Sequence, residues 1–160
     1  VPEGRHEVTT EGGLDIISQE AKLKKAIDRF TDAGIISSVF IDAEIDQIEA
    51  AARIGARVCE IHTGPYAHAF HNKGRDSESP AVLAELEKIR LAGEAIRAYG
   101  MRFNAGHALN YFNVQPVARL VGIRELHIGH AIISRAVFVG LREAVREMKS
   151  LMREAQSFGR

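Results

Sequence analysis

The feature that most constrains the fold of this chain is a unit of helix, glycine and apolar strand that occurs four times. In the first unit apolar residues recur at helical spacing from Leu23 to Phe30, Gly34 ends the segment, and the apolar run IISSVFID follows. The same order returns three more times, at residues 45–64, 82–109 and 113–133. Such alternation predicts parallel strands joined by right-handed crossover helices, either as an open doubly wound sheet or as a closed barrel.

Two observations favour the barrel. The glycines do not form the Gly-x-Gly-x-x-Gly pattern that opens a helix in a dinucleotide-binding sheet. Glu60 and His62 are two residues apart and therefore share one face of a strand, and a barrel interior near the strand ends tolerates such polar groups. A complete (β/α)8 barrel has eight βα units and about 250 residues. The four units therefore predict an α/β chain that supplies about half of a TIM barrel.

Four further segments carry structural expectations. The opening residues 1–15, VPEGRHEVTTEGGLD, have the composition of a long strand-to-helix loop, so we expect a strand to precede Val1. Asp42 is expected to be the N-cap of a helix that begins near Glu44. Residues 65–79 are expected to form a long loop at the rim. One long helix is expected to finish the chain with a core-facing stripe, made of Val137, Leu141, Val145, Met148 and Met152.

Glycines and polar side chains gather where the predicted strands end. Because the carboxyl ends of parallel strands meet at one edge, we expect one rim to carry Glu60, His62, Gly64, Asn104, Gly106, His107, Gly129 and His130. His107 is placed to donate a proton, since the ordinary pKa of histidine is about 6.5. Gly129 and His130 are expected to end the last strand just before a helix, whose free N–H groups suit a phosphate.

Each candidate residue also has a structural interpretation. Glu60 lies in an apolar strand, where an acid is costly unless it is paired or functional. A histidine such as His62 or His127 is often a hydrogen-bonded structural residue. Three histidines in polar segments are expected to be solvated, namely His6, His68 and His71. The sequence lacks the His-x-x-x-His, Cys-x-x-Cys and Asp-rich patterns of metal sites, so we predict no metal.

Charge and cysteine content exclude several classes of protein. Lysine plus arginine equals aspartate plus glutamate, at 21 each, so no net field attracts the chain to nucleic acid or to anionic lipid. No apolar run approaches the roughly 20 residues of a membrane helix. The single cysteine, Cys59, cannot form an internal disulfide, which favours the cytoplasm. We therefore expect no nucleic-acid partner and no membrane association.

Five motifs together resemble the pyridoxine 5'-phosphate synthase family, whose members close the ring in bacterial vitamin B6 synthesis. The motifs are EVTTEGGLD at 7–15, FIDA at 40–43, EIHTG at 60–64, NAGHALN at 104–110 and IGHAIISRAVFVGL at 128–141. They occur in order, at matching spacing and over essentially the whole chain. The resemblance implies that residues 1–160 are the C-terminal part of a single TIM-barrel domain, and that the N-terminal strands are absent from this chain.

The resemblance also implies an activity. Members of this family are transferase-type enzymes that condense 1-deoxy-D-xylulose 5-phosphate with 3-amino-2-oxopropyl phosphate, losing water and one phosphate, to form pyridoxine 5'-phosphate. They use no metal and no organic cofactor. The expected partners are therefore these two small phosphorylated substrates, and further copies of the chain in a homo-oligomer. The expected location is the bacterial cytoplasm.

Site residues follow from the resemblance motif by motif. Thr9 corresponds to a residue that contacts the deoxyxylulose phosphate. Glu60 corresponds to a residue that stabilises a charged transition state, and His107 to the proton donor. Gly129 and His130 correspond to residues that bind the aminoketone phosphate. The two general bases of the family lie in the N-terminal portion, so we expect the isolated chain to be catalytically incomplete.

Two residues of this chain depart from the family pattern. Ala108 stands where the family commonly has glycine, and its backbone N–H keeps the expected contact to substrate. His127 stands where the family often has asparagine.

Two other interpretations stay open. One is a different phosphate-binding barrel, an isomerase or an aldolase, although no lysine lies at a strand end to form a Schiff base. The other is a non-catalytic half-barrel fragment.

Overall fold

The four predicted units form one parallel sheet. The computed structural model describes residues 12–157, in which the strand order is β1-β2-β3-β4 and each strand pairs in parallel with the next. The strands are β1 (Ser38–Ile41), β2 (Val58–His62), β3 (Arg102–Gly106) and β4 (Ile123–His127). The helices are α1 (Glu20–Asp32), α2 (Ile45–Arg53), α3 (Gly64–Asn72), α4 (Pro80–Ala98), α5 (Val114–Ala118), α6 (His130–Val139) and α7 (Leu141–Ser157), and the short 3-10 helix η1 (Ile17–Gln19) precedes α1.

Glycines end the helices as the sequence predicts. After α1, Gly34 adopts a left-handed φ of 72° and its N–H donates to the carbonyl oxygen of Thr31. The N–H of Ile35 then donates to Phe30, so two carbonyl groups at the helix end are satisfied while the chain turns toward β1. A side chain with a β-carbon is disfavoured at this φ, which explains why glycine occupies the position.

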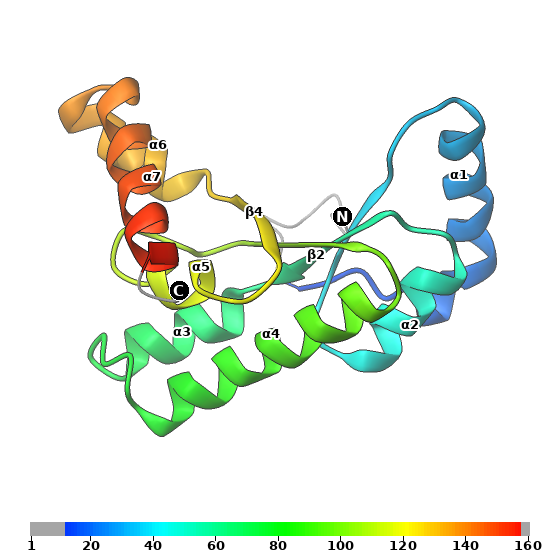
Figure 1. Ribbon diagram of the computed structural model, residues 1–160, viewed down its shortest axis with the longest axis horizontal. Helices are drawn as coiled ribbons and strands as arrows, with labels where there is room; N and C mark the ends of the chain where they lie inside the picture. Colours follow the sequence, from blue (N-terminus) through cyan, green and yellow to red (C-terminus); the bar gives the residue numbers. More distant parts are fainter. Residues whose placement is uncertain (1–11, 158–160) are drawn as a thin grey trace.

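The two faces of the sheet differ in polarity. Alternate strand residues pack against the helices and form the buried core, namely Val39, Ile41, Cys59, Ile61, Phe103 and Ala105. Ile48 of α2 and Ile89 and Ile96 of α4 close this core from the helix side. α2, α3 and α4 lie along this side of the sheet, as Figure 1 shows. The polar strand residues, Glu60 and His62 among them, lie on the opposite face and form the candidate site.

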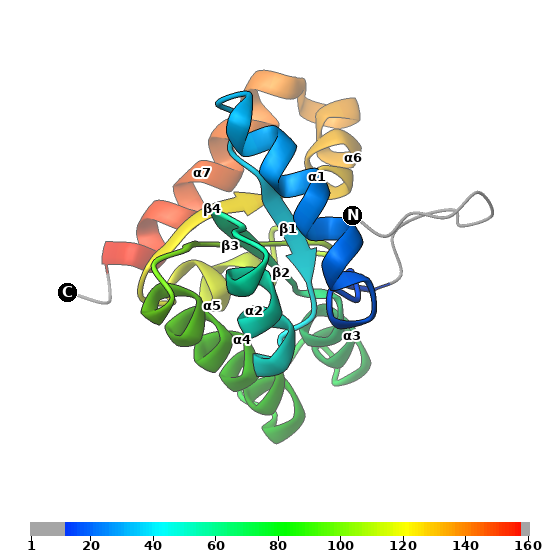
Figure 2. The ribbon, with the colours of Figure 1, turned by 90° about the vertical axis from the view of Figure 1, so that its right-hand side faces the viewer.

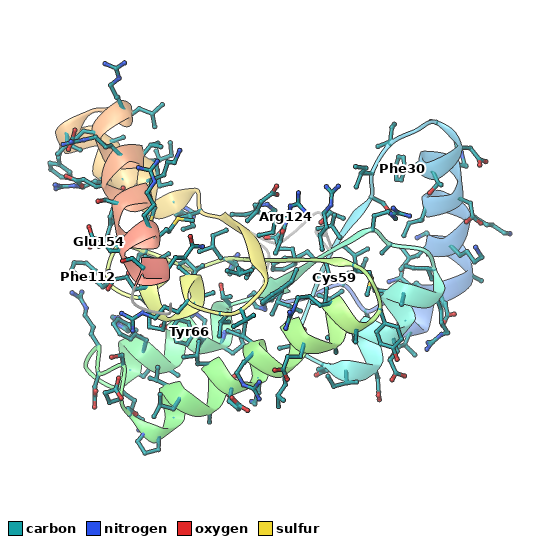
Figure 3. All side chains as sticks on the ribbon, in the orientation of Figure 1. Phe30, Cys59, Tyr66, Phe112, Arg124 and Glu154 are labelled. Carbon is teal, nitrogen blue, oxygen red and sulfur yellow. The ribbon has the colours of Figure 1, made fainter. Side chains whose placement is uncertain are left out.

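The sheet and its helices form an open half-ring. α1 lies at one end of the half-ring, and α6 and α7 lie at the other (Figures 1 and 2). Within residues 12–157, β1 and β4 each pair on one side only. Large apolar side chains are exposed at both ends: Phe30 is 48% and Ile36 is 57% exposed beside β1, and Phe112 is 66% exposed at the far end (Figure 3). Four parallel strands with two open edges are the arrangement of part of a (β/α)8 barrel.

The prediction of a loop over residues 65–79 is wrong. α3 occupies the first half of this segment, because Tyr66, Ala67 and Phe70 are spaced so that all three are buried on one side of a helix. Pro65 lies in the first turn, where its missing N–H costs nothing. The polar residues 73–79 alone remain as the connection to α4.

The prediction of one long terminal helix is also wrong. Gly140, with a φ of 82°, separates α6 from α7. Only part of the expected stripe faces the core: Met148 is 2% exposed, whereas Val137 is 79% and Leu141 is 58% exposed. The expected stripe is partly exposed because the half-ring is open at this end. Within the described residues nothing packs against the outer face of α6.

Gly93 sets how closely α4 approaches β3, and this generates a stability prediction. A β-carbon at Gly93 would overlap the Phe103 ring, which is 1% exposed and cannot move easily. Overpacking costs about 1–3 kcal/mol and the better helix propensity of alanine recovers up to about 1 kcal/mol. We therefore expect Gly93→Ala to lower the free energy of unfolding by about 1–2 kcal/mol, measured by urea denaturation.

Gly12→Ala is the matched control for this measurement. A β-carbon there would have as its nearest neighbour an Asp42 oxygen at 3.8 Å, an ordinary contact. The control should leave the unfolding midpoint unchanged. An equally stable Gly93→Ala variant would show that α4 and β3 are not packed as closely as described.

Candidate active site

The register between β2 and β3 brings the predicted rim residues together. Glu60 lies opposite Asn104, and His62 lies opposite Gly106. All four face away from the helices, on the face that becomes the interior of a closed barrel. A β-carbon at residue 106 would overlap Glu60 Oε1, so glycine is required at this position for the carboxylate to lie where it does.

His107 follows β3 directly and points its ring toward two aromatic neighbours. The ring centroid lies 4.9 Å from that of His62 in an edge-on arrangement and 6.2 Å from that of Phe40. The backbone here is unusual, because His107 has a φ of 82° and Ala108 a φ of 58°. Two consecutive non-glycine residues in this region are costly, about 1–3 kcal/mol each. Such strain is found mainly at functional sites.

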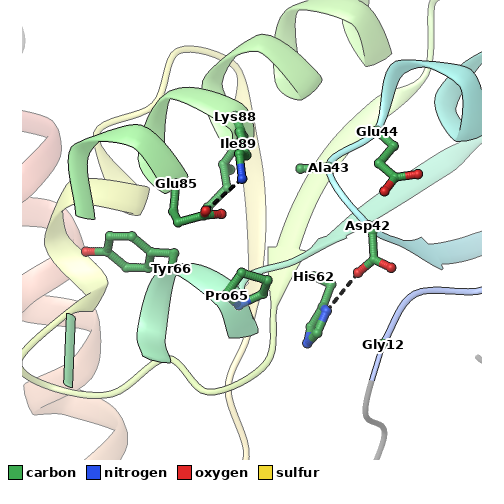
Figure 4. A pocket seen from close by; sticks show the side chains of 10 residues that line it. All are labelled: Gly12, Asp42, Ala43, Glu44, His62, Pro65, Tyr66, Glu85, Lys88 and Ile89. Atoms are coloured by element: carbon green, nitrogen blue, oxygen red, sulfur yellow. Dashed lines mark hydrogen bonds and ion pairs between the residues drawn. The ribbon is translucent and has the colours of Figure 1, made fainter. Parts of the chain in front are cut away.

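His62 is a hydrogen-bonded histidine at the centre of the rim. Its Nδ1 lies 2.9 Å from Asp42 Oδ1, and its side chain is 7% exposed (Figure 4). The other carboxylate oxygen of Asp42 accepts a hydrogen bond from the N–H of Gly13 at 3.1 Å. A β-carbon at Gly64 would overlap the His62 ring, so glycine is also required there.

The prediction that Asp42 caps α2 is therefore wrong. The N-cap of α2 is Glu44, and no side chain there makes a capping hydrogen bond. Asp42 instead joins the end of β1 to His62 at the end of β2. The sequence signal for an N-cap was the position of Asp42 just before a helix, but the nearer imidazole and the Gly13 N–H both compete for the same carboxylate.

Glu60 is paired with a histidine from β4. Its Oε2 lies 2.6 Å from His127 Nδ1, and its side chain is 18% exposed. The other ring nitrogen of His127 lies 3.5 Å from Glu125 Oε2, which also accepts a hydrogen bond at 3.0 Å from Asn104 Nδ2. The Asn104 side-chain oxygen is buried and has no hydrogen-bond partner in the described part of the chain. The interior face thus carries a connected polar network.

Sequence reasoning missed this network, although a signal was present. Glu125 and His127 are two residues apart on a strand, as are Glu60 and His62. The alternation that places Glu60 and His62 on the interior face also places Glu125 and His127 there. The identity of the partners still depended on how β3 and β4 are aligned, and that register shifts between Phe103 and Asn104.

The surroundings shift the pKa values of the two site histidines in opposite directions. Partial burial lowers the pKa of His107 below its ordinary 6.5, and the neighbouring His62, His68 and His130 lower it further against the opposing effect of Glu60. Burial also lowers the pKa of His127, but the hydrogen bonds and charges of Glu60 and Glu125 outweigh it, so the net shift is upward. His127 therefore holds a proton more readily than His107.

Gly129 and His130 lie at the start of α6. β4 ends at His127, so His130 is the first residue of the helix and does not belong to the strand as the sequence suggested. Gly129 is the N-cap, and no side chain makes a capping hydrogen bond there. The first N–H groups of a helix lack intrahelical acceptors, and both residues are exposed. A β-carbon at Gly129 would meet no described atom within 4 Å.

A pocket of about 630 Å³ lies beside the rim (Figure 4). It is lined by Asp42 and His62 from the strand ends, by Tyr66 of α3, and by Glu85 and Lys88 of α4. Glu60 and His107 do not line it, because they face the open interior of the half-ring, which has no opposite wall within residues 12–157. The pocket and the interior face therefore meet at His62.

Several expectations lie outside the described residues or concern surface positions. Thr9 and His6 lie outside residues 12–157. His68 and His71, expected in a loop, lie on α3 and are exposed as predicted. No group of three or more His, Cys, Asp or Glu side chains between residues 12 and 157 could hold a metal ion. In the same part of the chain no helix combines the length and the apolar character needed to cross a bilayer.

Comparison with known proteins gives consistent matches. A family model described as "Pyridoxal phosphate biosynthesis protein PdxJ" matches residues 1–154. Proteins named pyridoxine 5'-phosphate synthase are similar to this chain: that of Azoarcus sp. (strain BH72) is 82% identical over 97% of the chain, and that of Dechloromonas aromatica (strain RCB) is 79% identical over 99%. A more distant relative from Magnetococcus marinus is 51% identical over 97% of the chain. The chain spans 62%, 63% and 61% of the lengths of these three relatives.

The paired carboxylates around His127 generate a pH-dependent stability prediction. Because the folded-state pKa of His127 is raised, its stabilising effect is fully present below pH 6.5 and is lost as the pH rises through the raised value. We expect His127→Gln to lower the urea midpoint clearly below pH 6.5 and much less near about pH 9.

Glu60→Gln provides the control background. With the main partner carboxylate removed, His127→Gln should produce a smaller pH-dependent difference. A loss of stability that is the same at both pH values in both backgrounds would mean that His127 acts by packing alone.

Proposed function

Because the chain belongs to the PdxJ family of pyridoxal phosphate biosynthesis proteins, we propose that it carries part of the active site of a pyridoxine 5'-phosphate synthase. In this proposal residues 1–160 are the C-terminal part of one TIM-barrel domain, and the rest of the protein supplies strands that pair with β1 and β4. The reaction joins 1-deoxy-D-xylulose 5-phosphate to 3-amino-2-oxopropyl phosphate, with loss of water and phosphate.

The observation that carries this proposal is the juxtaposition of three features at one strand-end rim. A carboxylate, Glu60, and an imidazole, His107, face the interior from adjacent strands. The uncapped start of α6, at His130, follows the next strand, three residues beyond His127. Condensation of phosphorylated substrates requires an anion site, a proton donor and a negative group near developing positive charge, and these three features match those requirements.

Each residue has a distinct role in the proposed reaction. The backbone N–H groups at Gly129 and His130 bind the phosphate of the aminoketone. His107 donates a proton to a departing hydroxyl group, so that it leaves as water. Glu60 stabilises a charged transition state. The Ala108 N–H contacts substrate beside His107, and Thr9 contacts the deoxyxylulose phosphate.

The lowered pKa of His107 has a consequence for this mechanism. In the ligand-free chain His107 is mainly neutral at neutral pH, because burial and neighbouring histidines disfavour its charged form. Two phosphorylated substrates bring negative charge into the site, and nearby negative charge raises the pKa of a histidine. Substrate binding therefore favours the protonated form of His107, which is the form that can donate a proton.

The proposal extends to location and assembly. We place the enzyme in the bacterial cytoplasm, which agrees with the bacterial source of the relatives and with the single cysteine, Cys59, that is buried and free. We also propose a homo-oligomer. Exposed apolar side chains on α6, such as Val137 at 79% and Phe138 at 83%, are available for contacts with the rest of the chain or with another copy.

The proton-donor role predicts a loss of turnover without a loss of binding. In the complete enzyme, His107→Asn should lower kcat by about 100- to 10,000-fold, because asparagine cannot transfer the proton. The KM values for both substrates should stay within about 3-fold, and the limb of the pH-rate profile that reports the histidine should disappear. Product formation and the melting temperature are measured on one preparation. A destabilised variant with undiminished kcat would remove His107 from the mechanism.

The phosphate role of the α6 start predicts the opposite pattern for Gly129. Gly129→Val should weaken the binding of 3-amino-2-oxopropyl phosphate by about 10-fold or more, because its branched side chain covers the N–H groups. Stability should change little, since a β-carbon there meets no described atom within 4 Å. Calorimetric titration and thermal melting test both statements. Parallel losses of affinity and stability would identify Gly129 as a packing residue.

A further inference from the structure

The backbone at His107 is held by a threonine from the neighbouring strand end. Thr63, the residue after β2, is fully buried, and its Oγ1 lies 2.6 Å from the carbonyl oxygen of Gly106 and 2.6 Å from that of His107. A threonine hydroxyl has one proton, so the two carbonyl groups share it. The Thr63 N–H also donates to the Gly106 carbonyl at 2.8 Å. Thr63 thus contacts the chain just where its φ becomes left-handed.

Thr63 makes these contacts in place of a more usual one. It is the N-cap of α3, a position at which a threonine hydroxyl ordinarily accepts a hydrogen bond from an N–H in the first turn of its helix. No such capping bond is present at α3. The hydroxyl instead donates across to the end of β3. The Thr63 hydroxyl therefore contacts the backbone of residue 107 and does not stabilise the N-terminus of α3.

The other side of the same turn is held by Asn113. This side chain is 1% exposed, and its Nδ2 donates to the carbonyl oxygen of Ala108 at 3.3 Å. Its Oδ1 accepts a hydrogen bond from the Asn110 N–H at 2.7 Å. Tyr66 of α3, labelled in Figure 3, donates its hydroxyl to the Asn113 carbonyl at 2.9 Å. The left-handed pair 107–108 is therefore bound on both sides, and Thr63 is the member that contacts residue 107 itself.

We propose that Thr63 is a positioning residue for the reaction, which holds the backbone of His107 in its left-handed conformation and so directs the imidazole into the barrel interior beside His62. Thr63 does not touch the substrate in this proposal and acts only through His107. The inference rests on the proposed function, since it assigns His107 the proton transfer. A misplacement of about 1 Å at a catalytic group can reduce a rate by about 100-fold.

The test compares three replacements in the complete enzyme. Thr63→Val keeps the shape and removes the hydroxyl, and it should lower kcat by about 10- to 100-fold while the KM values stay within about 3-fold. Thr63→Ser keeps the hydroxyl and should restore kcat to within about 3-fold of the parent. Thr63→Ala, which also lacks the hydroxyl, is measured alongside. If Thr63→Val does not fold, Thr63→Ala is compared with Thr63→Ser instead. Equal kcat values for the serine variant and for a folded variant without the hydroxyl would overturn the proposal.

A second comparison separates positioning from general structural damage. If Thr63 acts through His107, Thr63→Val should cause no further loss of kcat in a His107→Asn background. If the fold-losses of kcat in the two single variants multiply in the double variant, Thr63 has a role separate from His107, and the proposal is overturned.

A readout that does not need turnover keeps this inference distinct from the proposed function. The titration of His107, followed by NMR in the ligand-free protein, should move toward 6.5 in Thr63→Val and stay at the parental position in Thr63→Ser, because release of the backbone exposes the ring. A parent without synthase activity would refute the proposed function. An unchanged titration in a folded Thr63→Val protein would refute the positioning role.

Discussion

The parallel pairing of β2 with β3 is the interaction on which the candidate site depends. It places Glu60 opposite Asn104 and His62 opposite Gly106, on strands that lie about 4.8 Å apart. At that spacing, side chains from the two strand ends come within contact distance. The pairing also explains the absence of a side chain at residue 106, because the Glu60 carboxylate occupies the space that a β-carbon would take. A shift of one residue in register would turn the interior residues toward the helices.

The polarity of the two sheet faces follows from what each face meets. The outer face is formed by apolar strand residues such as Ile61 and Phe103, which pack against apolar helix residues such as Ile48 and Ile89. The inner face holds Glu60, Glu125 and His127, which satisfy one another in part. The buried Asn104 oxygen has no partner within residues 12–157, and a buried acceptor without a hydrogen bond is costly. A polar interior of this kind is consistent with a half-ring whose inner face is covered by the other strands of a complete barrel.

Stability is given up at the point where the proposed chemistry takes place. His107 and Ala108 both have left-handed φ values, and neither has the conformational freedom of glycine. Thr63 leaves its own helix uncapped to bind the same turn. Each feature is locally unfavourable, and together they hold one imidazole next to another. The rigid outer core, in which Phe103 and Ile61 are almost fully buried, supports this arrangement.

The sequence by itself determined the four repeats of helix, glycine and strand, the glycines that end those helices, and the edge at which Glu60 and His107 meet, but it predicted neither α3 nor the break between α6 and α7. These features depend on periodicity and on φ preferences, which are set by neighbours within a turn or two along the chain. The tertiary structure alone decided that Asp42 binds His62 across 20 residues and that Thr63 binds His107 across 44. It also decided that His127 pairs with Glu60 and that α6 keeps an exposed apolar face. The physical reason is that a side chain takes the partner that register and packing bring nearest, and no local pattern along the chain encodes that distance.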